Sequence, residues 1–484
     1  MTRLALVALA IATTAHAETR PRYGGAIEAS LLGAPVTFDP AHAQTHAELE
    51  VAGLLFDTLY AIGPDGVPRP HLAAGPPISD SAHTTVRVPI ARGIKFHDGS
   101  ELTPADVAAS LERARRSPAR FALAPIATIK ADADAIELTL RVPSVDVAAL
   151  LALPQLAITK AGKAPGERPI GTGPFALASI DRGKKSLALR EFDDHFAGRP
   201  YLDELVLRWY DAPDGEARRY ETGGAQVSAR GATAFAGGTP MYRAGNVEGP
   251  AALLLFVGFG RAHADVTSNV AFRRALDLAL ARGALAAIGA GERVSAAAVP
   301  VPVEAGGAAI GGAAKAGNLD GARAALATIA PAKLAGLKLE ILVEDTRPDD
   351  REIAERVLRA LDKLGIAVTI TALPVAAMRD RVARGQTDLW IGQLAEPVAS
   401  PLAWWGGAFA AGGDDWLERK LAGAPLDVTA TAKAFAERLP IVPLAFRAVR
   451  IWYRTDVHGL AFDASGRVGY ADAFMFGDPV KGKK

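Results

Sequence analysis

The chain has 484 residues, of which 50% are hydrophobic, so it is long enough to bury a large core and to form about two to four domains. The 54 Lys and Arg residues nearly balance the 53 Asp and Glu residues, and this balance excludes the strongly basic surface that gathers nucleic acid. The absence of cysteine excludes disulfides, thiolate metal sites, cysteine nucleophiles and a lipid-modified cysteine.

The first residues have the pattern of an export signal. Arg3 precedes the apolar run 4–12, and the small-residue site Ala15-His16-Ala17 follows. We expect cleavage after Ala17 and a periplasmic protein that is not a lipoprotein. The apolar run is shorter than the roughly 20 residues that span a bilayer, so no membrane anchor is predicted.

The N-terminal third mixes short strands with helix-start signals. Residues 23–32 and 84–90 are predicted strands, and 47–60 has the apolar spacing of a helix. A second helix is predicted after Thr103, which is a suitable N-cap residue and is followed by proline and, at the third position, Asp106.

The second half is predicted to be α/β in character. Residues 337–343 alternate as a strand, 351–364 repeat apolar residues at helical spacing, and 366–373 alternate again. A strand, a helix and a strand in this order imply a parallel pair joined by a right-handed crossover. The Ala-, Gly- and Pro-rich stretch 296–318 is predicted to be a long irregular connection.

Signatures of catalysis are nearly absent from the sequence. It contains no GxSxG, HExxH, P-loop or GxGxxG motif, so no catalytic residue, metal site or cofactor is predicted and the chain is not expected to be an enzyme. His42 and His46 could hold a metal on one helix face, but ordinary solvated histidines are the favoured explanation.

Tryptophan is concentrated near the C-terminus. Five of the six follow residue 389: Trp390, Trp404, Trp405, Trp416 and Trp452. An indole offers a large flat apolar surface with one hydrogen-bond donor, which suits a ligand cleft, although core packing is an alternative explanation. Trp404, Trp405 and Trp390 are therefore candidate ligand contacts.

Several short segments resemble a known family. Residues 93–107 (GIKFHDGSELTPADV) with 110–113 closely resemble the signature of the family 5 extracellular solute-binding proteins, the peptide and nickel receptors of ABC importers. Further similar segments follow in the family's order: 23–25, 38–40, 55–59, 64–66, 171–175, 196–204 and 270–276. The resemblance runs from about residue 23 to the C-terminus and is looser over 223–249 and 289–317.

The resemblance implies an α/β, two-lobed periplasmic binding protein fold of type II, cluster C, with an additional N-terminal subdomain. After a signal peptide at 1–17, the expected parts are a first lobe of 18–45, 169–250 and 441–484, a subdomain of 46–168, and a second lobe of 251–440. Two chain crossings, near Gly249-Pro250 and Pro440-Ile441, would form the hinge.

The resemblance also implies a ligand site. In peptide-binding members, an aspartate in a W-x-x-D segment of the second lobe accepts the ligand's ammonium group. Here Glu396 stands at the acid and Gln393 replaces the tryptophan, in a stretch that is one residue longer. Glu396 is thus expected to contact a cationic ligand group, the alternative being a solvated carboxylate at the rim. Tyr23 is a further candidate contact.

Three arginines after residue 378 have two possible roles. Arg379, Arg381 and Arg384 could meet a ligand carboxylate, or they could be charges on a helix surface.

The expected function is that of a periplasmic substrate-binding component of an ABC importer. It would capture a small polar ligand, a peptide or peptide-like molecule, between two lobes and present it to the membrane permease as a monomer. The alternatives are an exported hydrolase or a sensory ligand receptor on a similar scaffold.

Overall fold

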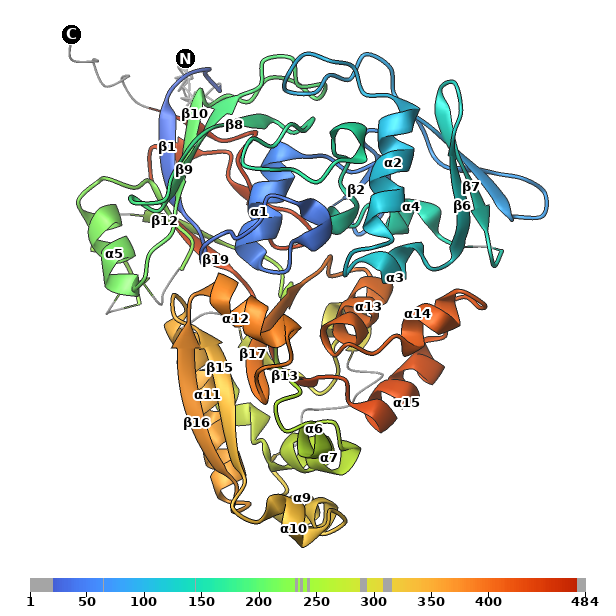
Figure 1. The fold of residues 1–484 in the computed structure, drawn as a ribbon. Helices are drawn as coiled ribbons and strands as arrows, with labels where there is room; N and C mark the ends of the chain where they lie inside the picture. The colour runs from blue at the N-terminus through green and yellow to red at the C-terminus, as the bar shows by residue number, and fades with distance from the viewer. Residues whose placement is uncertain are drawn as a thin grey trace, which may run out of the picture.

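The computed structural model describes residues 21–476, except 64, 144, 231–233, 236–237, 242–243, 288–293 and 308–315. The predicted export signal lies outside the described residues. Two lobes stand one above the other (Figure 1). Within the described ranges, no helix is both long enough and apolar enough to cross a membrane.

The first lobe is built on a seven-stranded sheet in the order β12-β19-β11-β1-β10-β9-β8. Its strands are β1 (Ala26–Ser30), β8 (Phe175–Asp181), β9 (Ser186–Glu191), β10 (Glu204–Arg208), β11 (Val227–Ser228), β12 (Ala244–Glu248) and β19 (Arg450–Arg454). The helix α1 (His46–Leu55) packs into the same core, because its Val51 and Leu55 are buried beside residues of β1 and β10. The predicted strand and helix of this region are shorter than expected but present.

The subdomain has a four-stranded antiparallel sheet in the order β4-β5-β7-β6. Its elements are β4 (Ile78–Ser79), β5 (Thr85–Pro89), α2 (Pro104–Ala114), α3 (Arg120–Leu123), β6 (Ile126–Ala131), β7 (Ala135–Leu140), α4 (Val147–Leu150), η2 (Pro154–Leu156) and η3 (Lys160–Gly162). The predicted start of α2 is confirmed: the side chains of Thr103 and Asp106 each accept a hydrogen bond from the other's backbone amide.

The second lobe has a six-stranded sheet in the order β14-β18-β13-β17-β15-β16. Its strands are β13 (Leu253–Phe259), β14 (Val294–Ala296), β15 (Lys338–Glu344), β16 (Ala367–Leu373), β17 (Leu389–Ala395) and β18 (Val442–Arg447). The predicted β-α-β unit is confirmed, since β15 and β16 pair in parallel and α11 (Pro348–Asp362) connects them.

The remaining elements are helices that connect or cover these sheets and three small two-stranded sheets. The helices are η1 (Pro40–His42), α5 (Pro213–Glu221), α6 (Ala264–Thr267), α7 (Val270–Ala279), η5 (Arg282–Ala287), η6 (Val303–Ala305), α9 (Leu319–Leu326), α10 (Pro331–Leu334), α12 (Val375–Ala383), α13 (Pro401–Ala411), α14 (Trp416–Leu421) and α15 (Val428–Arg438). Three small two-stranded sheets pair β2 (Tyr60–Ile62) with β3 (Pro68–Pro70), β20 (Val457–His458) with β23 (Phe474–Met475), and β21 (Ala461–Phe462) with β22 (Val468–Gly469).

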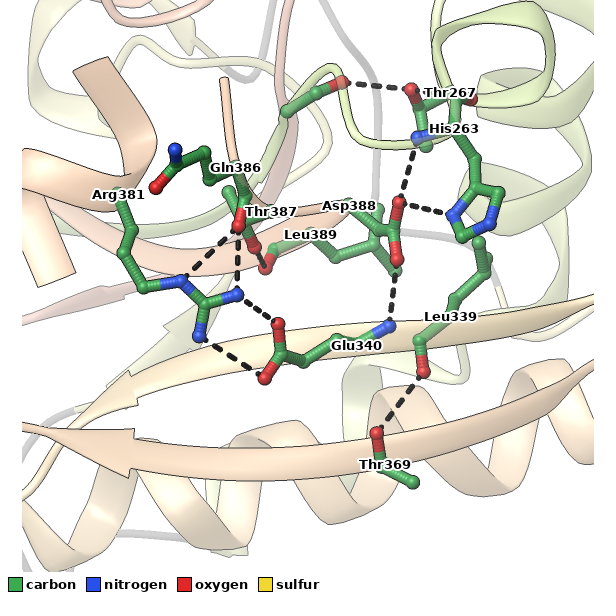
Figure 2. A network of polar contacts seen from close by, with 11 residues as sticks. His263, Thr267, Leu339, Glu340, Thr369, Arg381, Gln386, Thr387, Asp388 and Leu389 are labelled. Atoms are coloured by element: carbon green, nitrogen blue, oxygen red, sulfur yellow. Dashed lines mark hydrogen bonds and ion pairs between the residues drawn. The ribbon is translucent and has the colours of Figure 1, made fainter. Parts of the chain in front are cut away.

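A buried aspartate sets the start of β17. The carboxylate of Asp388 accepts hydrogen bonds from the backbone amides of Glu340, on β15, and His263, and lies 2.8 Å from Nδ1 of His263 (Figure 2). A one-residue slip between β15 and β17 would break these bonds, so Asp388 fixes the register of the two parallel strands.

The chain crosses between the two large sheets twice. The first crossing lies between β12 and β13, at residues 249–252, and the second lies between β18 and β19, at residues 448–449. The second is later than the expected Pro440-Ile441, because β18 still pairs with β13 in the second lobe's sheet. Likewise, α1 packs in the core of the first lobe, whereas the expected boundary at residue 46 places it in the subdomain.

Three of the family-like segments meet where the first lobe joins the subdomain. The Thr172 hydroxyl donates to the buried carboxylate of Asp57, 2.9 Å away. The Gly171 amide donates to Nδ1 of His97, whose Nε2 therefore carries the proton and donates to the Gly173 carbonyl, 3.0 Å away. These motif residues thus build the scaffold, which explains why they identify the fold without identifying the ligand.

The glycine at 171 is required by a close backbone approach, which a substitution tests. A Cβ atom at Gly171 would lie 1.9 Å from the carbonyl oxygen of Leu55, whereas a Cβ at Gly75 would meet no atom within 4 Å. We expect Gly171→Ala to lower the free energy of unfolding by about 3 kcal/mol, as overpacking does, and Gly75→Ala to leave it nearly unchanged. Urea denaturation followed by circular dichroism measures both, and equal midpoints would contradict the packing described here.

Candidate ligand-binding site

A cavity of about 480 Å³ lies between the two lobes, a size typical of sites for small molecules. The first lobe and the subdomain contribute Ala41, Ala43, Gln44, Thr45, Leu49, residues 116–121 and Gln155. The second lobe contributes Phe256, Glu344, Arg347, Val375, Met378, Arg379, Val382, Ala383, residues 390–396, Gly407, Ala410 and Ala411. The cavity is therefore lined on both sides by parts of the chain that are distant in sequence.

The topology of the second lobe's sheet explains where the cavity lies. β15 and β17 run parallel, so their carboxyl ends meet at one edge of the sheet. Glu344 ends β15, and Glu396 directly follows β17. Both side chains line the cavity, at the edge where open α/β sheets commonly bind ligands.

Glu396 is a buried carboxyl group with one satisfied oxygen. Its exposed fraction is 3%, and Oε1 accepts a hydrogen bond from Nε2 of Gln155 at 3.1 Å, across the cavity. Oε2 has no hydrogen-bond partner among the described residues. Burial raises the pKa of Glu396 to about 8, against the opposing effect of the Gln155 hydrogen bond. Without a ligand, this acid is therefore mostly neutral at pH 7.

The indole of Trp390 lines the cavity on a face of the sheet where two glycines make room. Trp390 stands opposite Gly258 in the register of β13 and β17, and Phe256 stands opposite Gly392. A Cβ atom at either glycine would lie within 2.3 Å of the indole. The Phe256 ring meets Trp390 edge to face, with centroids 5.0 Å apart. The two rings therefore form a continuous aromatic wall, with Gln393 on the same strand.

An ion pair joins the two lobes beside the cavity. The fully buried carboxylate of Glu48, on α1, accepts hydrogen bonds from both Nη atoms of Arg379, on α12, at 2.7 and 2.5 Å. The same carboxylate accepts four backbone amides, at distances of 2.9 to 3.3 Å, from Val36, Thr37, Gln44 and Thr45. The first lobe thus presents a preorganised carboxylate to a guanidinium of the second lobe.

The subdomain makes its own contacts with the second lobe. The ring of Phe121, on α3, lies against Gly406 of α13 so closely that a Cβ there would come within 2.1 Å of it. Nε of Arg120 donates to Glu418 at 2.7 Å. Figure 1 shows α3 directly above α13 and α14, where the subdomain meets the second lobe.

The other two candidate arginines do not line the cavity. Arg381 forms ion pairs with Glu340 of β15 and donates to the Gln386 carbonyl (Figure 2). Arg384 pairs with Asp380 on its own helix, 2.8 Å away. Both therefore act as surface charges of the second lobe.

The structure brings some of the sequence-predicted site residues together and not others. Glu396, Gln393 and Trp390 line the cavity. Trp404 and Trp405 do not line the cavity; they are fully buried in a core cluster that also contains Phe256, and they contact Phe446 and Phe435 edge to face. For these two tryptophans, the core-packing explanation is therefore correct and the ligand-contact explanation is wrong. Tyr23 is 64% exposed and lies beside Tyr201 and Arg199, outside the cavity lining.

The paired histidines of α1 and its approach make separate contacts. Nδ1 of His42 lies 2.9 Å from Asp39, and Nε2 of His46 lies 2.7 Å from the Gly466 carbonyl. Among the residues that the structure describes, no group of three or more His, Asp or Glu side chains could hold a metal ion.

Sequence reasoning missed three features of the cavity: Gln155, Phe256 and the Glu48–Arg379 pair. Gln155 donates to a residue 241 positions away, and Glu48 and Arg379 are 331 positions apart. Glu48 does carry a local signal, because Thr45 and Glu48 have the spacing of a capping box. That signal predicts a helix start and does not predict the guanidinium partner.

Comparison with known proteins identifies the family. The family model described as bacterial extracellular solute-binding proteins, family 5 Middle, matches residues 67–415. The chain belongs to this family. The resemblance found in the short sequence segments is thus confirmed, and so is the two-lobed α/β fold.

Two curated relatives match part of the chain. The nickel-binding protein NikA of Staphylococcus aureus (strain NCTC 8325 / PS 47) is 27% identical over 143 residues, 29% of each chain. The glutathione-binding protein GsiB of Escherichia coli O1:K1 / APEC is 30% identical over 205 residues, 40% of each chain. The matches therefore span well under half the length of these relatives.

Solved structures match nearly the whole chain. The dipeptide binding protein from Pseudoalteromonas sp. SM9913, in complex with Met-Leu, has a TM-score of 0.79 at 17% identity, and the match covers 93% of this chain and 100% of that one. The oligopeptide-binding protein AppA from Bacillus subtilis, in complex with a nonapeptide, has a TM-score of 0.76 at 17% identity, covering 95% and 100%. At such identities the likeness establishes the fold.

Removing the guanidinium that bridges the lobes should loosen their contact. We expect Arg379→Met to shift the protein toward separated lobes, because the pair supplies about 1 to 3 kcal/mol of hydrogen bonding to a charged group. Folding should persist, since Glu48 keeps its four backbone donors. Small-angle X-ray scattering would report a larger radius of gyration. Arg384→Met, which removes an arginine outside the cavity, is the matched control, and equal radii for both variants would contradict the bridging role.

Proposed function

We propose that this protein is the substrate-binding component of an ABC importer and holds a small ligand in the cavity between its lobes. The observation that carries the proposal is a cavity lined by both lobes of the chain, in a member of the extracellular solute-binding family. Ligand contacts to both sides would stabilise the joined lobes, and the membrane permease would recognise that form. The protein would act as a monomer.

Glu396 is the proposed contact for a cationic group of the ligand. Its Oε2 atom is buried without a partner, so a ligand N–H donor would satisfy an otherwise costly group. Gln393 and Trp390 are proposed to contact the rest of the ligand, since both line the cavity, from opposite faces of β17. Gln155 would hold the Glu396 carboxyl from the opposite side.

The cavity chemistry supports binding without catalysis. Its only lining serine within the described chain, Ser117, donates to the Ala114 carbonyl at 2.8 Å and accepts the Ala119 amide at 3.1 Å. No histidine is among the described lining residues to activate it. This arrangement favours a binding protein over the exported hydrolase.

The proposed location is the periplasm, after cleavage of the export signal following Ala17. The family's extracellular designation supports export. A sensory receptor would bind its ligand in the same cavity and would differ only in the membrane partner.

Ligand screening tests the proposed function. The exported protein would be assayed by thermal shift against amines, amino acids, short peptides and chelated metals. A ligand at a hundred times its Kd should add about 2.7 kcal/mol of stability. We expect at least one such ligand, recovered unchanged after incubation by mass spectrometry, and Glu396→Gln should weaken its binding. Conversion of the ligand to a product, or stabilisation by no compound of any class, would contradict the proposal.

Binding of a cationic ligand should depend on pH through Glu396. The pKa of about 8 means that most Glu396 side chains carry a proton at neutral pH, and that proton must leave when a cation binds. The affinity should therefore fall as pH falls below 8, by about tenfold per unit, and level off above it. Isothermal titration calorimetry at pH 6.5, 7.5 and 9 measures this. The residual binding of Glu396→Gln should not vary with pH, and a wild-type affinity that rises toward acid pH would refute the assignment.

A further inference from the structure

The charged side chains of the cavity indicate which ligand charges it can accept. Within the described lining, six charged residues occur: Arg116, Arg120, Glu344, Arg347, Arg379 and Glu396. A ligand carboxylate needs a guanidinium whose own partner is absent or weak, and a ligand amine needs a carboxyl group with an open acceptor. The partners of these six therefore decide between the two kinds of ligand.

Two of the four guanidiniums, those of Arg347 and Arg379, are already paired with buried carboxylates of the protein. Arg379 donates twice to Glu48. Arg347 lies 2.9 Å from Glu344 and 2.6 Å from Asp350. These three acids are almost completely buried. A ligand carboxylate would have to displace one of these acids, so the hydrogen bonds that it gained would replace hydrogen bonds and ion pairs that the protein already makes.

The other two guanidiniums lie toward solvent. Arg120 is half exposed and pairs with Glu418. Arg116 is exposed. A ligand carboxylate held by either would remain hydrated and screened, so it would gain little from the contact. The cavity therefore provides no strong position for a ligand carboxylate among its described residues.

The carboxyl group of Glu396 offers what the guanidiniums do not, a buried atom that is open to a ligand. Glu396 is deeper than the exposed arginines, and its Oε2 atom has no partner within the described chain. The cavity lining as a whole is largely apolar and includes Leu49, Phe121, Phe256, Met378, Trp390 and Leu394. An ammonium group that reached Oε2 would make a charge-assisted hydrogen bond in poorly hydrated surroundings, while an apolar body would cover the rings and aliphatic side chains.

From this arrangement we infer that the ligand is an organic amine with an apolar body and no carboxylate, rather than an amino acid or a peptide. The inference rests on the proposed function, because it assigns a ligand class to the same cavity. The Glu48–Arg379 pair already makes the contact that a ligand carboxylate would otherwise make with Arg379. The atom that could accept a ligand amine, Oε2 of Glu396, has no partner among the described residues.

Matched pairs of compounds that differ only in a carboxylate test the ligand class. The exported protein would be titrated calorimetrically with 2-phenylethylamine against phenylalanine, tyramine against tyrosine, and agmatine against arginine, with the dipeptide Gly-Phe added. We expect at least one amine to bind about tenfold or more tightly than its amino acid, because only the amino acid brings an unpaired carboxylate into the cavity.

Two variants locate the binding. Glu396→Gln should weaken binding of the preferred amine by about thirtyfold or more, because the charge-assisted hydrogen bond is lost. Glu355→Gln, an exposed change on α11 outside the cavity, should leave the affinity unchanged. Circular dichroism would verify folding of both. The comparison of amine with amino acid uses the wild-type protein and stays decisive even if Glu396→Gln fails to fold.

The outcomes separate the ligand class from the proposed function. If an amino acid or Gly-Phe binds as tightly as the amines, and Glu396→Gln weakens that binding, the amine class is overturned while the proposed function stands. If other compounds in the screen bind and no amine binds, the amine class is likewise overturned and the proposed function stands. If no compound of any class binds, the proposed function fails and the amine inference fails with it.

Discussion

A single buried carboxylate, that of Glu48, connects the parts of the structure that surround the cavity. This carboxylate accepts hydrogen bonds from four backbone amides in the loop after β1 and at the start of α1. Contacts within the first lobe alone therefore fix its position. It also receives the guanidinium of Arg379 from the other lobe. The hydrogen bonds to the Glu48 carboxylate offset the free energy that burial of its charge requires. Separation of the lobes would break the bonds from Arg379 and remove one wall of the cavity.

The second buried acid of this region, Glu396, has a different chemical role because its surroundings differ. One hydrogen bond, from Gln155, serves a carboxyl group that lies between α13 and the end of β17. Gly407 leaves the space that this carboxyl occupies, since a Cβ there would come within 3.2 Å of Oε1. Both oxygens of Glu48 thus have hydrogen-bond partners, whereas Oε2 of Glu396 has none among the described residues. That contrast underlies both the proposed cation contact and the inference of an amine ligand.

The family-like segments serve the scaffold, and this separates what identifies the fold from what selects the ligand. Asp57, Thr172 and His97 hold the junction of first lobe and subdomain through hydrogen bonds among themselves and to Gly171 and Gly173. None of these five residues lines the cavity. The cavity residues instead lie elsewhere, for example on β17 and α12, so the residues that identify the fold are distinct from those that line the ligand site.

The sequence by itself determined the features that depend on neighbours along the chain: the Thr103 cap of α2, the strand-helix-strand unit from β15 to β16, and the family, through its short segments. Through the family resemblance, the sequence also indicated Glu396 as a ligand contact, and the structure places this residue in the cavity wall. Only the tertiary structure decided that Arg379 meets Glu48, that Trp404 and Trp405 lie in the core, and that the second crossing follows β18. Those outcomes depend on contacts between residues far apart in sequence, and no local pattern of hydrophobicity or charge encodes which distant partner a side chain will meet.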